Sequence, residues 1–413
     1  MNVFCRLVGL PALALVSQFV WAGHGSAPSS SQPAYCKDSA AAPTPKCART
    51  PSVVFDADGR LWLSWVQQGR IYVQSSKDGG KTLSKPVAVN REPENVLAHG
   101  ESRPKIAIGP KGEIYLTWTQ GLEKRFSSYI RFARSVDGGK TFSKPVTVND
   151  NLDIIGHSFD SLAISRDGKI FIAWLDARDV EAAKAKNQPY NGSSLYYTWS
   201  DDGGKSFKPN VKAADYTCQC CRLQAAIDID GLPLIVWRNV YPENIRDHAL
   251  LKFADWDKPG RPVRVTHENW HIEGCPHHGP GLSIARDGRY HLTWYSAAPD
   301  ATGLFYAYSD DVGSHFTQPI KFGNPAAMPA HPHVLSVGRR VDLVWLEFDG
   351  KNNQLKTMRS TDGGANWTEP RVLAEAESGA DNPFLHANGD RVYVSWATEK
   401  DGLKVIALDG AGR

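Results

Sequence analysis

The sequence predicts an all-β protein, a β-propeller with seven blades. The chain of 413 residues carries 13 Trp, 36 Gly and 26 Pro, a composition that favours strands joined by tight turns. An apolar strand ending in Trp recurs seven times, at intervals of 51 to 63 residues. A period near fifty with several short strands per repeat is typical of propeller blades, so a single propeller domain would account for nearly the whole chain.

The composition and charge of the chain indicate a globular protein and argue against a nucleic acid partner. Hydrophobic residues make up 41% and charged residues 22%, which predicts an ordinary globular protein. The net charge is only +3, from 47 Lys and Arg against 44 Asp and Glu, and no long basic run occurs. We therefore do not expect a nucleic acid partner, because such binding needs clustered cations to neutralise phosphates.

The N-terminal segment predicts export. Residues 1–22 carry one Arg near the start, an apolar stretch over 7–21 and a small-x-small end, the pattern of a cleaved signal peptide. No other apolar run is long enough to span a membrane, so we expect a periplasmic or secreted protein. Residues 23–47, rich in Ser, Ala and Pro, predict a flexible lead-in, and residues 48–413 a single propeller domain.

Six cysteines would remain after removal of the signal peptide, in a compartment that permits disulfides. Cys36 and Cys47 lie eleven residues apart in the lead-in, and we expect them to form a local disulfide.

The Trp strands define the repeat. Before each strand lies a short turn, such as Asp56–Gly59, that predicts a hairpin joining it to the apolar strand in front. Seven copies predict seven blades, with six as the alternative. The strands end at Trp65, Trp118, Trp174, Trp237, Trp294, Trp345 and Trp396.

A second motif recurs in phase with the Trp strands. Five segments begin with Ser, carry an Asp two residues later and continue through Gly to a large apolar residue; they start at Ser76, Ser135, Ser200, Ser309 and Ser360. They resemble the Asp boxes of the sialidase-like (BNR) propeller families, over about residues 48–410. The resemblance implies that the boxes lie between the third and fourth strands, on the face opposite the site. We therefore assign their carboxylates a structural role: Asp78, Asp137, Asp202, Asp311 and Asp362.

Two blades depart from the pattern. Blade four carries only a degenerate box at residues 254–260, and blade seven has none. We expect the last blade to have three strands of its own and to borrow a fourth from the region before Thr50.

The loops that enter each blade are candidates for a site. Residues before each first strand and after each Trp should converge around the mouth of the central channel. Seventeen residues before the Trp, blades two to five place metal-capable side chains in one register: Glu101, His157, Cys220 and His277. Nearby offsets add His99, Cys218, Cys221, Cys275 and His278, and blade six adds His331 and His333.

This set predicts a transition-metal site, because thiolates with imidazoles suit copper or zinc. The protein would then be a metal binder or a metalloenzyme. A disulfide from Cys218 or Cys220 to Cys275 is the alternative for these thiols. The expected ligands are Cys218, Cys220, Cys221, Cys275, His277, His278, His157, Glu101 and His331.

A glycan-acting hydrolase or lyase is the alternative function. Arg103, in Ser102-Arg103-Pro104, resembles the Arg-Ile-Pro element of sialidases without its Ile, although no Tyr/Glu pair follows the family spacing. In this hypothesis Arg103 and Arg222 hold the carboxylate of an anionic sugar, and His157 or His277 is the acid/base. Asp160 is a further candidate for the acid. A third possibility is a recognition propeller without catalysis.

Overall fold

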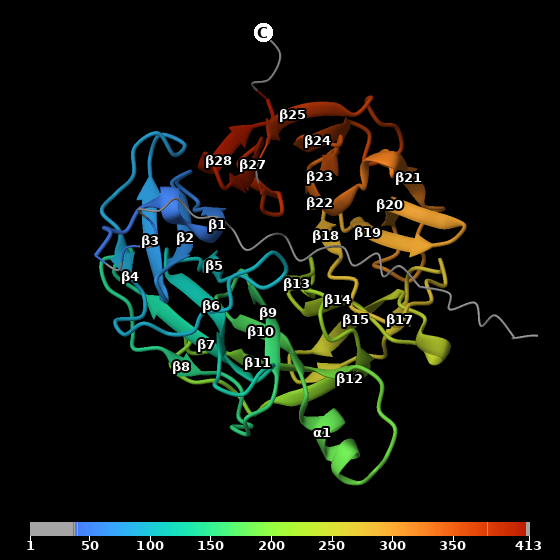
Figure 1. Cartoon of the computed structure of the whole chain (residues 1–413), viewed down its shortest axis with the longest axis horizontal. Helices are drawn as coiled ribbons and strands as arrows, with labels where there is room; N and C mark the ends of the chain where they lie inside the picture. The colour runs from blue at the N-terminus through green and yellow to red at the C-terminus, as the bar shows by residue number, and fades with distance from the viewer. Residues whose placement is uncertain (1–35, 37, 39, 378, 410–413) are drawn as a thin grey trace, which may run out of the picture.

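The computed structural model describes residues 36, 38, 40–377 and 379–409, which form a closed ring of seven β-sheets (Figure 1). The expected signal peptide, residues 1–22, lies outside the described residues, as does most of the expected lead-in. Seven blades are confirmed, and the six-bladed alternative is wrong. Trp65 and Trp396 belong to different sheets.

Each blade is a meander of antiparallel strands taken from one continuous stretch of chain. Blade one holds β1 (Arg49–Phe55), β2 (Leu61–Gln67), β3 (Arg70–Ser76) and β4 (Val87–Ala88). Blade two holds β5 (Lys105–Ile108), β6 (Ile114–Gly121), β7 (Ser128–Ser135) and β8 (Val146–Thr147). Blade three holds β9 (His157–Ile164), β10 (Ile170–Asp176), β11 (Ser193–Ser200) and β12 (Val211–Thr217).

The other four blades repeat this order, with variation at their outer edges. Blade four holds β13 (Gln224–Ile227), β14 (Pro233–Arg238), β15 (His248–Asp255), β16 (Lys258–Pro259) and β17 (Val263–Arg264). Blade five holds β18 (Gly281–Ile284), β19 (Tyr290–Ala298), β20 (Ala301–Ser309) and β21 (Ile320–Phe322). Blade six holds β22 (Ala330–Val337), β23 (Arg340–Phe348), β24 (Asn353–Ser360) and β25 (Arg371–Ala376). Blade seven holds β26 (Phe384–Asn388), β27 (Arg391–Thr398) and β28 (Gly402–Ala407).

The first strand of each blade lines the axis, and these strands contact one another around the ring until β26 meets β1. The second strands carry the seven repeated Trp side chains, each at most 1% exposed. Because a single sheet leaves both faces apolar, each blade buries its faces against its two neighbours. The hydrophobic cores therefore lie between blades, and the polar loops gather at the two ends of the channel.

The Asp boxes are tight turns between the third and fourth strands, as predicted. In blade two, Asp137 accepts hydrogen bonds from the Thr141 amide (3.0 Å) and hydroxyl (2.6 Å), while Ser135 Oγ accepts from the Gly139 amide (2.9 Å). These bonds hold the pKa of the Asp137 carboxyl below its usual range. The Ser135 hydroxyl also donates to Asp137 at 2.7 Å, and the same Ser-to-Asp bond occurs in the other four boxes, which start at Ser76, Ser200, Ser309 and Ser360.

Four of the five regular boxes, those of blades two, three, five and six, also pack on the blade before them. The box glycine Gly139 sits against the ring of Trp62 in blade one, and the box residue Phe207 packs edge-on against Phe132 in blade two at 5.0 Å. In blade four the degenerate box supplies Trp256, which is buried against Phe171 of blade three. An aromatic contact to the preceding blade therefore persists where the box sequence is lost.

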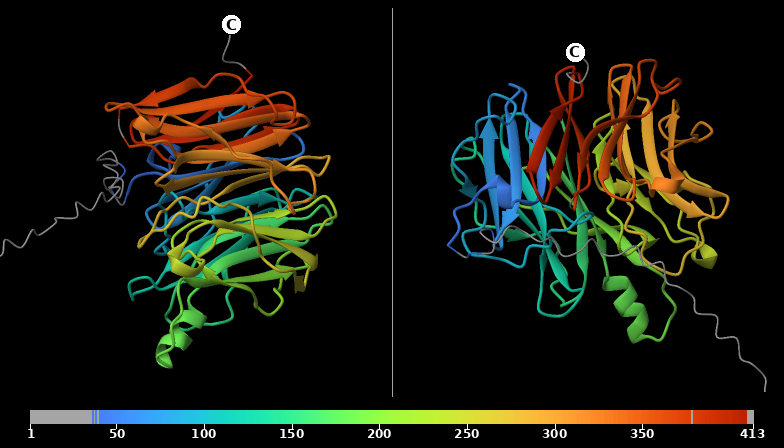
Figure 2. Two further views of the ribbon diagram at one scale, coloured as in Figure 1. Left: turned by 90° about the vertical axis from the view of Figure 1, so that its right-hand side faces the viewer. Right: turned by 45° about the horizontal axis from the view of Figure 1, so that its top comes forward.

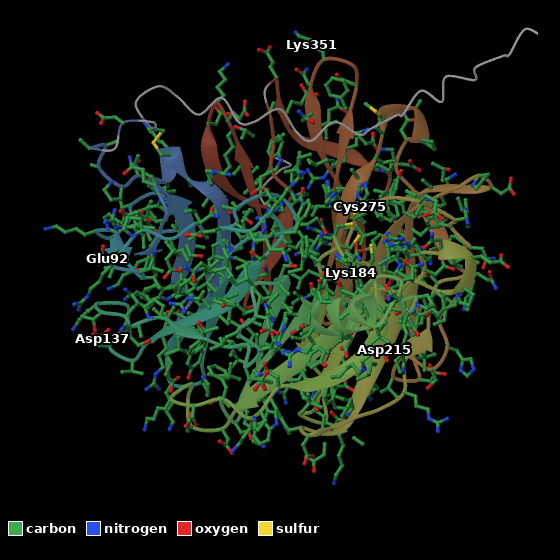
Figure 3. The ribbon with its side chains drawn as sticks, turned by 60° about the horizontal axis from the view of Figure 1, so that its bottom comes forward. Glu92, Asp137, Lys184, Asp215, Cys275 and Lys351 are labelled. Atoms are coloured by element: carbon green, nitrogen blue, oxygen red, sulfur yellow. A yellow bond between two sulfur atoms is a disulfide. The ribbon has the colours of Figure 1, made fainter. Side chains whose placement is uncertain are left out.

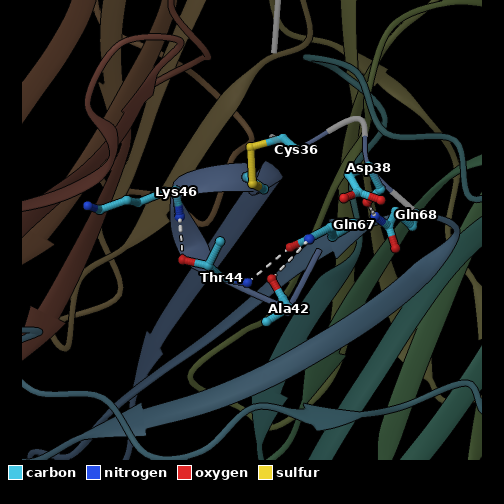
Figure 4. Close-up of a disulfide and its surroundings, with 8 residues drawn as sticks. Cys36, Asp38, Ala42, Thr44, Lys46, Gln67 and Gln68 are labelled. Carbon is cyan, nitrogen blue, oxygen red and sulfur yellow. Dashed lines mark hydrogen bonds between the residues drawn. A yellow bond between two sulfur atoms is a disulfide. The ribbon is translucent and has the colours of Figure 1, made fainter. Parts of the chain in front are cut away.

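The seam between the two ends of the chain differs from expectation. The segment before β1 forms the 3-10 turn η2 (Pro45–Cys47) beside β28, rather than a fourth strand, and blade seven keeps three strands. Cys36 and Cys47 form the predicted disulfide, and Thr44 donates its amide to Gln67 Oε1 at 3.0 Å (Figure 4). The N-terminal segment is therefore fixed to the second strand of blade one.

One helix, α1 (Arg178–Ala185), projects from blade three away from the ring (Figure 2). It has eight residues, and no helix within the described ranges is long and apolar enough to cross a membrane.

Candidate functional site

The candidate site lies at the mouth of the channel, on the face opposite the Asp boxes. First strands leave this face, second strands return to it, and third strands lead away to the boxes, since all neighbouring strands are antiparallel. Figure 3 shows Cys275 near the middle of the ring in a view tilted toward one end of the molecule. The loops that precede β13 and β18 carry all the free cysteines of the described residues: Cys218, Cys220, Cys221 and Cys275.

The carboxylate of Glu101 connects several blades on this face through hydrogen bonds. It accepts hydrogen bonds from Arg222 Nη1 at 2.6 Å and the Arg222 amide at 3.1 Å, from the Gly279 amide at 2.8 Å and from Asn382 Nδ2 at 3.2 Å. His331 Nδ1 lies 3.4 Å away. Residues of blades two, four, five, six and seven thus meet at one buried carboxylate.

The charge state of Glu101 follows from these partners. Its burial would raise the pKa of the carboxyl, but the Arg222 guanidinium and His331 outweigh that effect and hold the pKa well below its usual range. Glu101 is therefore ionised although it is buried, and its charge stabilises the contacts between the blades. A group engaged by four donors has little capacity left for a metal ion.

The cysteines form a compact cluster. Cys218 Sγ lies 3.5 Å from Cys221 Sγ and 3.8 Å from Cys220 Sγ, and all three residues are buried. A second triad consists of Cys220, Cys275 and His277, with their ligand atoms within 4.8 Å of one another. Cys275 and His277 are exposed, so Cys220 connects a buried group of thiols to a group open to solvent.

The local backbone explains why these thiols converge. β12 ends at Thr217, and the Cys218 amide donates to the Arg238 carbonyl at 2.9 Å, which fixes the start of a tight turn. A turn brings the side chains of residues two and three positions apart toward each other, whereas an extended chain would separate them. On the opposite loop, His277 adopts a left-handed backbone (φ 53°), a conformation uncommon for residues other than Gly.

A buried cation lies beside the cluster. Arg246 Nη1 is 3.5 Å from Cys218 Sγ. Hydrogen bonds from Cys220 and Cys221, together with the charge of Arg246, lower the pKa of the Cys218 thiol, whereas the pKa values of Cys220 and Cys221 are raised. A hydrogen bond with Cys220 lowers the pKa of Cys275 to about 7. Negative charge is therefore favoured on Cys218 in the buried group and on Cys275 in the exposed group, whereas Cys220 and Cys221 favour the protonated thiol in the absence of a metal ion.

Comparison with known proteins gives the fold of the chain and no family. No family model matches the sequence, and no curated protein matches it. Among solved structures, an ulvan lyase of polysaccharide lyase family PL25 has a TM-score of 0.56 at 12% identity, over 87% of this chain and 93% of that one. The Hadza microbial sialidase Hz136 has a TM-score of 0.51 at 13% identity, over 82% and 73%.

An α-L-arabinanase from Penicillium chrysogenum has a TM-score of 0.51 at 14% identity, over 74% of this chain and 92% of that one. The chain shares the β-propeller fold of these proteins. At such identities the likeness extends to the fold alone, and the chemistry must come from the side chains of this chain.

The arginines considered for an anionic sugar already have internal partners. Arg103 Nη2 donates to Asp381 at 2.6 Å, and Arg222 pairs with Glu101. Both guanidinium groups lie near the ring of Phe384 and are almost wholly buried. Their charges therefore stabilise the mouth of the channel in this structure.

Two of the acid/base candidates, His157 and Asp160, are also enclosed. His157 is the first residue of β9, where its Nδ1 lies 2.8 Å from the Ser128 carbonyl and its Nε2 3.7 Å from Asp176. Asp160 accepts from the hydroxyls of Thr117 at 2.6 Å and Thr119 at 3.1 Å. Neither residue belongs to the cysteine cluster, since their partners are in blades two and three.

The nine expected metal ligands thus divide into separate groups. Five lie in the two overlapping triads: Cys218, Cys220, Cys221, Cys275 and His277. His278 stacks between Tyr295 at 4.1 Å and His331 at 4.6 Å, and His331 faces Glu101. His157 belongs to the interface of blades two and three.

Two residues of the mouth were missed from the sequence. Asp381 stands fifteen residues before Trp396, the same offset as Arg103 and Arg222 before their own Trp, so the register could have paired it with them. Arg246 lies in a loop that follows a Trp strand, on the predicted face, but its offset has no counterpart in other blades. Only the fold shows that it reaches Cys218.

Proposed function

We propose that the cysteine and histidine cluster at the channel mouth binds a thiophilic transition metal ion, copper(I) or zinc(II). One observation carries this proposal: three buried sulfur atoms lie together, two of their separations being 3.5 and 3.8 Å. Metal–thiolate bonds of about 2.3 Å place the sulfurs of a trigonal site about 4.0 Å apart and those of a tetrahedral site about 3.8 Å apart. The thiols are therefore almost at ligand spacing.

The surroundings favour the same function. The Arg246 guanidinium offsets part of the charge that metal thiolates carry, and burial protects the inner sulfurs from solvent. The signal peptide expected at residues 1–22 would place such a site in the periplasm or outside the cell, where a metal-binding protein meets imported or excreted ions.

Metal content after reconstitution tests this proposal. We expect the reduced protein, exposed anaerobically to Cu(I) or Zn(II) and then desalted, to retain at least one ion per chain of one of these metals. The variant Cys220→Ser/Cys221→Ser should keep less than about a tenth of that content, because it removes two of three inner ligands. His267→Ala, an exposed histidine on the same side of the ring, is the matched control and should retain full content. A wild-type protein without bound metal would overturn the proposal.

A glycan-acting or glycan-binding function is the second candidate, and the comparisons favour it over the metal site. The sialidase, the lyase and the arabinanase all act on glycans by their names. A pocket of about 470 Å³ opens on the mouth face at the loops of blade two, with Asn95, Gln120, Glu123 and Tyr129 among its lining residues. Amide, carboxylate and aromatic groups suit sugar hydroxyls and ring faces.

Exposed cations lie next to this pocket. Lys124 and Arg125 are in the loop that supplies Glu123, so a sulfated or uronate sugar could be held here, while Arg103 and Arg222 remain in their internal ion pairs.

Product release and binding test the second candidate. We expect uronate-rich and sialylated glycans to bind to the wild type, with loss of most binding in Gln120→Ala/Tyr129→Ala and none in the exposed control Glu369→Gln. New reducing ends, unsaturated uronate or free sialic acid would show which reaction follows. If no glycan binds, or if the double variant binds as the wild type does, the pocket is not a sugar site.

A further inference from the structure

The two triads at the channel mouth share one atom. Cys220 Sγ belongs both to the buried group with Cys218 and Cys221 and to the group open to solvent with Cys275 and His277. Five ligand atoms therefore form two sets of three, because the sulfur of Cys220 belongs to both sets.

From this arrangement we infer that the cluster holds two copper(I) ions bridged by the Cys220 thiolate. This inference rests on the metal-binding function proposed above. An inner ion would take Cys218, Cys220 and Cys221, and an outer ion would take Cys220, Cys275 and His277. Thiolate sulfur has several lone pairs and can bridge two soft cations.

The number of ligands selects the metal. Two tetrahedral zinc ions that share one ligand need seven donors, whereas two three-coordinate ions that share one need five. The triads supply five donors, all sulfur or imidazole nitrogen, and neither triad includes a carboxylate. Soft ligands of this kind select copper(I), which accepts three-coordinate geometry.

The charges agree with this choice. Four thiolates with two copper(I) ions carry a net charge of −2, and two buried guanidinium groups stand on the inner side. Arg246 Nη1 lies 3.5 Å from Cys218 Sγ, and Arg238 Nη1 donates to the Arg246 carbonyl at 2.7 Å. The two cations can therefore balance the cluster without a further counterion.

The exposure of the ligands gives the two ions different roles. Cys275 and His277 are open to solvent, whereas Cys218 and Cys221 are each at most 2% exposed. Copper would enter and leave through the outer triad, and the inner triad would retain its ion. Exchange with an external ligand should therefore be faster for one copper than for the other.

Titration with copper(I) under argon, against a coloured copper(I) chelator, tests the inference. A thiol titration beforehand shows whether the Cys36–Cys47 disulfide is intact. We expect two ions per wild-type chain, and one ion in each of Cys218→Ser/Cys221→Ser and Cys275→Ser/His277→Ala. The control His267→Ala should bind two. Thermal unfolding of each variant checks that it is folded.

X-ray absorption at the copper edge tests the bridge itself. The wild type with two coppers should show a short copper–copper distance, which Cys220→Ser should lose even if it still binds copper at the separated ligand pairs. One ion per wild-type chain, or two ions without copper–copper scattering, would overturn the bridged pair but leave the proposed metal function standing. A wild type that binds no copper(I) or zinc(II) would overturn both.

Discussion

Glu101→Gln should lower the free energy of unfolding by about 3–5 kcal/mol, the cost of leaving a buried cation without its counterion. Arg222, whose guanidinium donates to Glu101 at 2.6 Å, is only 6% exposed and cannot turn to solvent. Glutamine keeps the shape of the side chain but loses the charge and replaces one acceptor with a donor. Urea denaturation followed by Trp fluorescence measures the change.

Two further variants make this expectation specific. Glu369→Gln removes a carboxylate from the surface and should change stability by less than about 0.5 kcal/mol. Adding Arg222→Met to Glu101→Gln removes the guanidinium that has lost its counterion. The double variant should therefore regain part of the lost free energy of unfolding. If Glu101→Gln is as stable as the wild type, this carboxylate does not stabilise the contacts between blades at the channel mouth.

The same carboxylate should also make stability depend on acidity. The pKa of Glu101 is lower in the folded protein than the value of about 4.3 in an unfolded chain, so its contribution is complete above that value. The contribution is then lost as the pH falls below about 4 toward the folded pKa. The difference in stability between wild type and Glu101→Gln should therefore shrink over this acid range.

Gly139→Ala should destabilise the interface of blades one and two by about 2–5 kcal/mol. Its left-handed backbone (φ 77°) costs a side-chain-bearing residue about 1–2 kcal/mol. The added methyl would also lie 2.8 Å from the ring of Trp62, and overpacking costs a further ~1–3 kcal/mol.

The neighbouring glycine separates these two causes. Gly138 has a similar φ of 71°, but a Cβ there would meet nothing within 4 Å. Gly138→Ala should therefore show the backbone cost alone. Equal losses of stability in the two variants would mean that the box glycine does not pack on the preceding blade.

The fold could be predicted because its signals are local and repeated. Each Trp strand and each box is determined by residues close in sequence, so seven copies gave the blade number despite the irregular fourth and seventh blades. The fourth strand expected for blade seven was wrong because the prolines and the Cys36–Cys47 disulfide form a turn there instead. Proline lacks the amide that a paired strand would need.

The site was predicted in part, since equal offsets from the Trp brought Cys220 and His277 together but not His157. In blade three the first strand begins earlier, at His157 itself, so the same offset falls inside the sheet rather than in the loop. Glu101 also lies seventeen residues before its Trp, but its carboxylate pairs with Arg222 instead of joining the cysteines. An offset gives the position of the backbone, whereas neighbouring charges decide where a side chain turns.

The continuity of each sheet in sequence has a consequence for the order in which the protein forms. Because every sheet comes from one stretch of chain, its strands can pair with one another before distant parts of the chain are in place, whereas its apolar faces are buried only when the neighbouring blades pack on it. The contacts of Glu101 with Asn382 and of Arg103 with Asp381 span 281 and 278 residues, so they must wait for the last blade. Until blade seven packs against blade one, the ring is an open arc in which the Arg103 guanidinium has not yet met Asp381. Closure of the ring should therefore be the last step of folding, because it alone forms these two contacts.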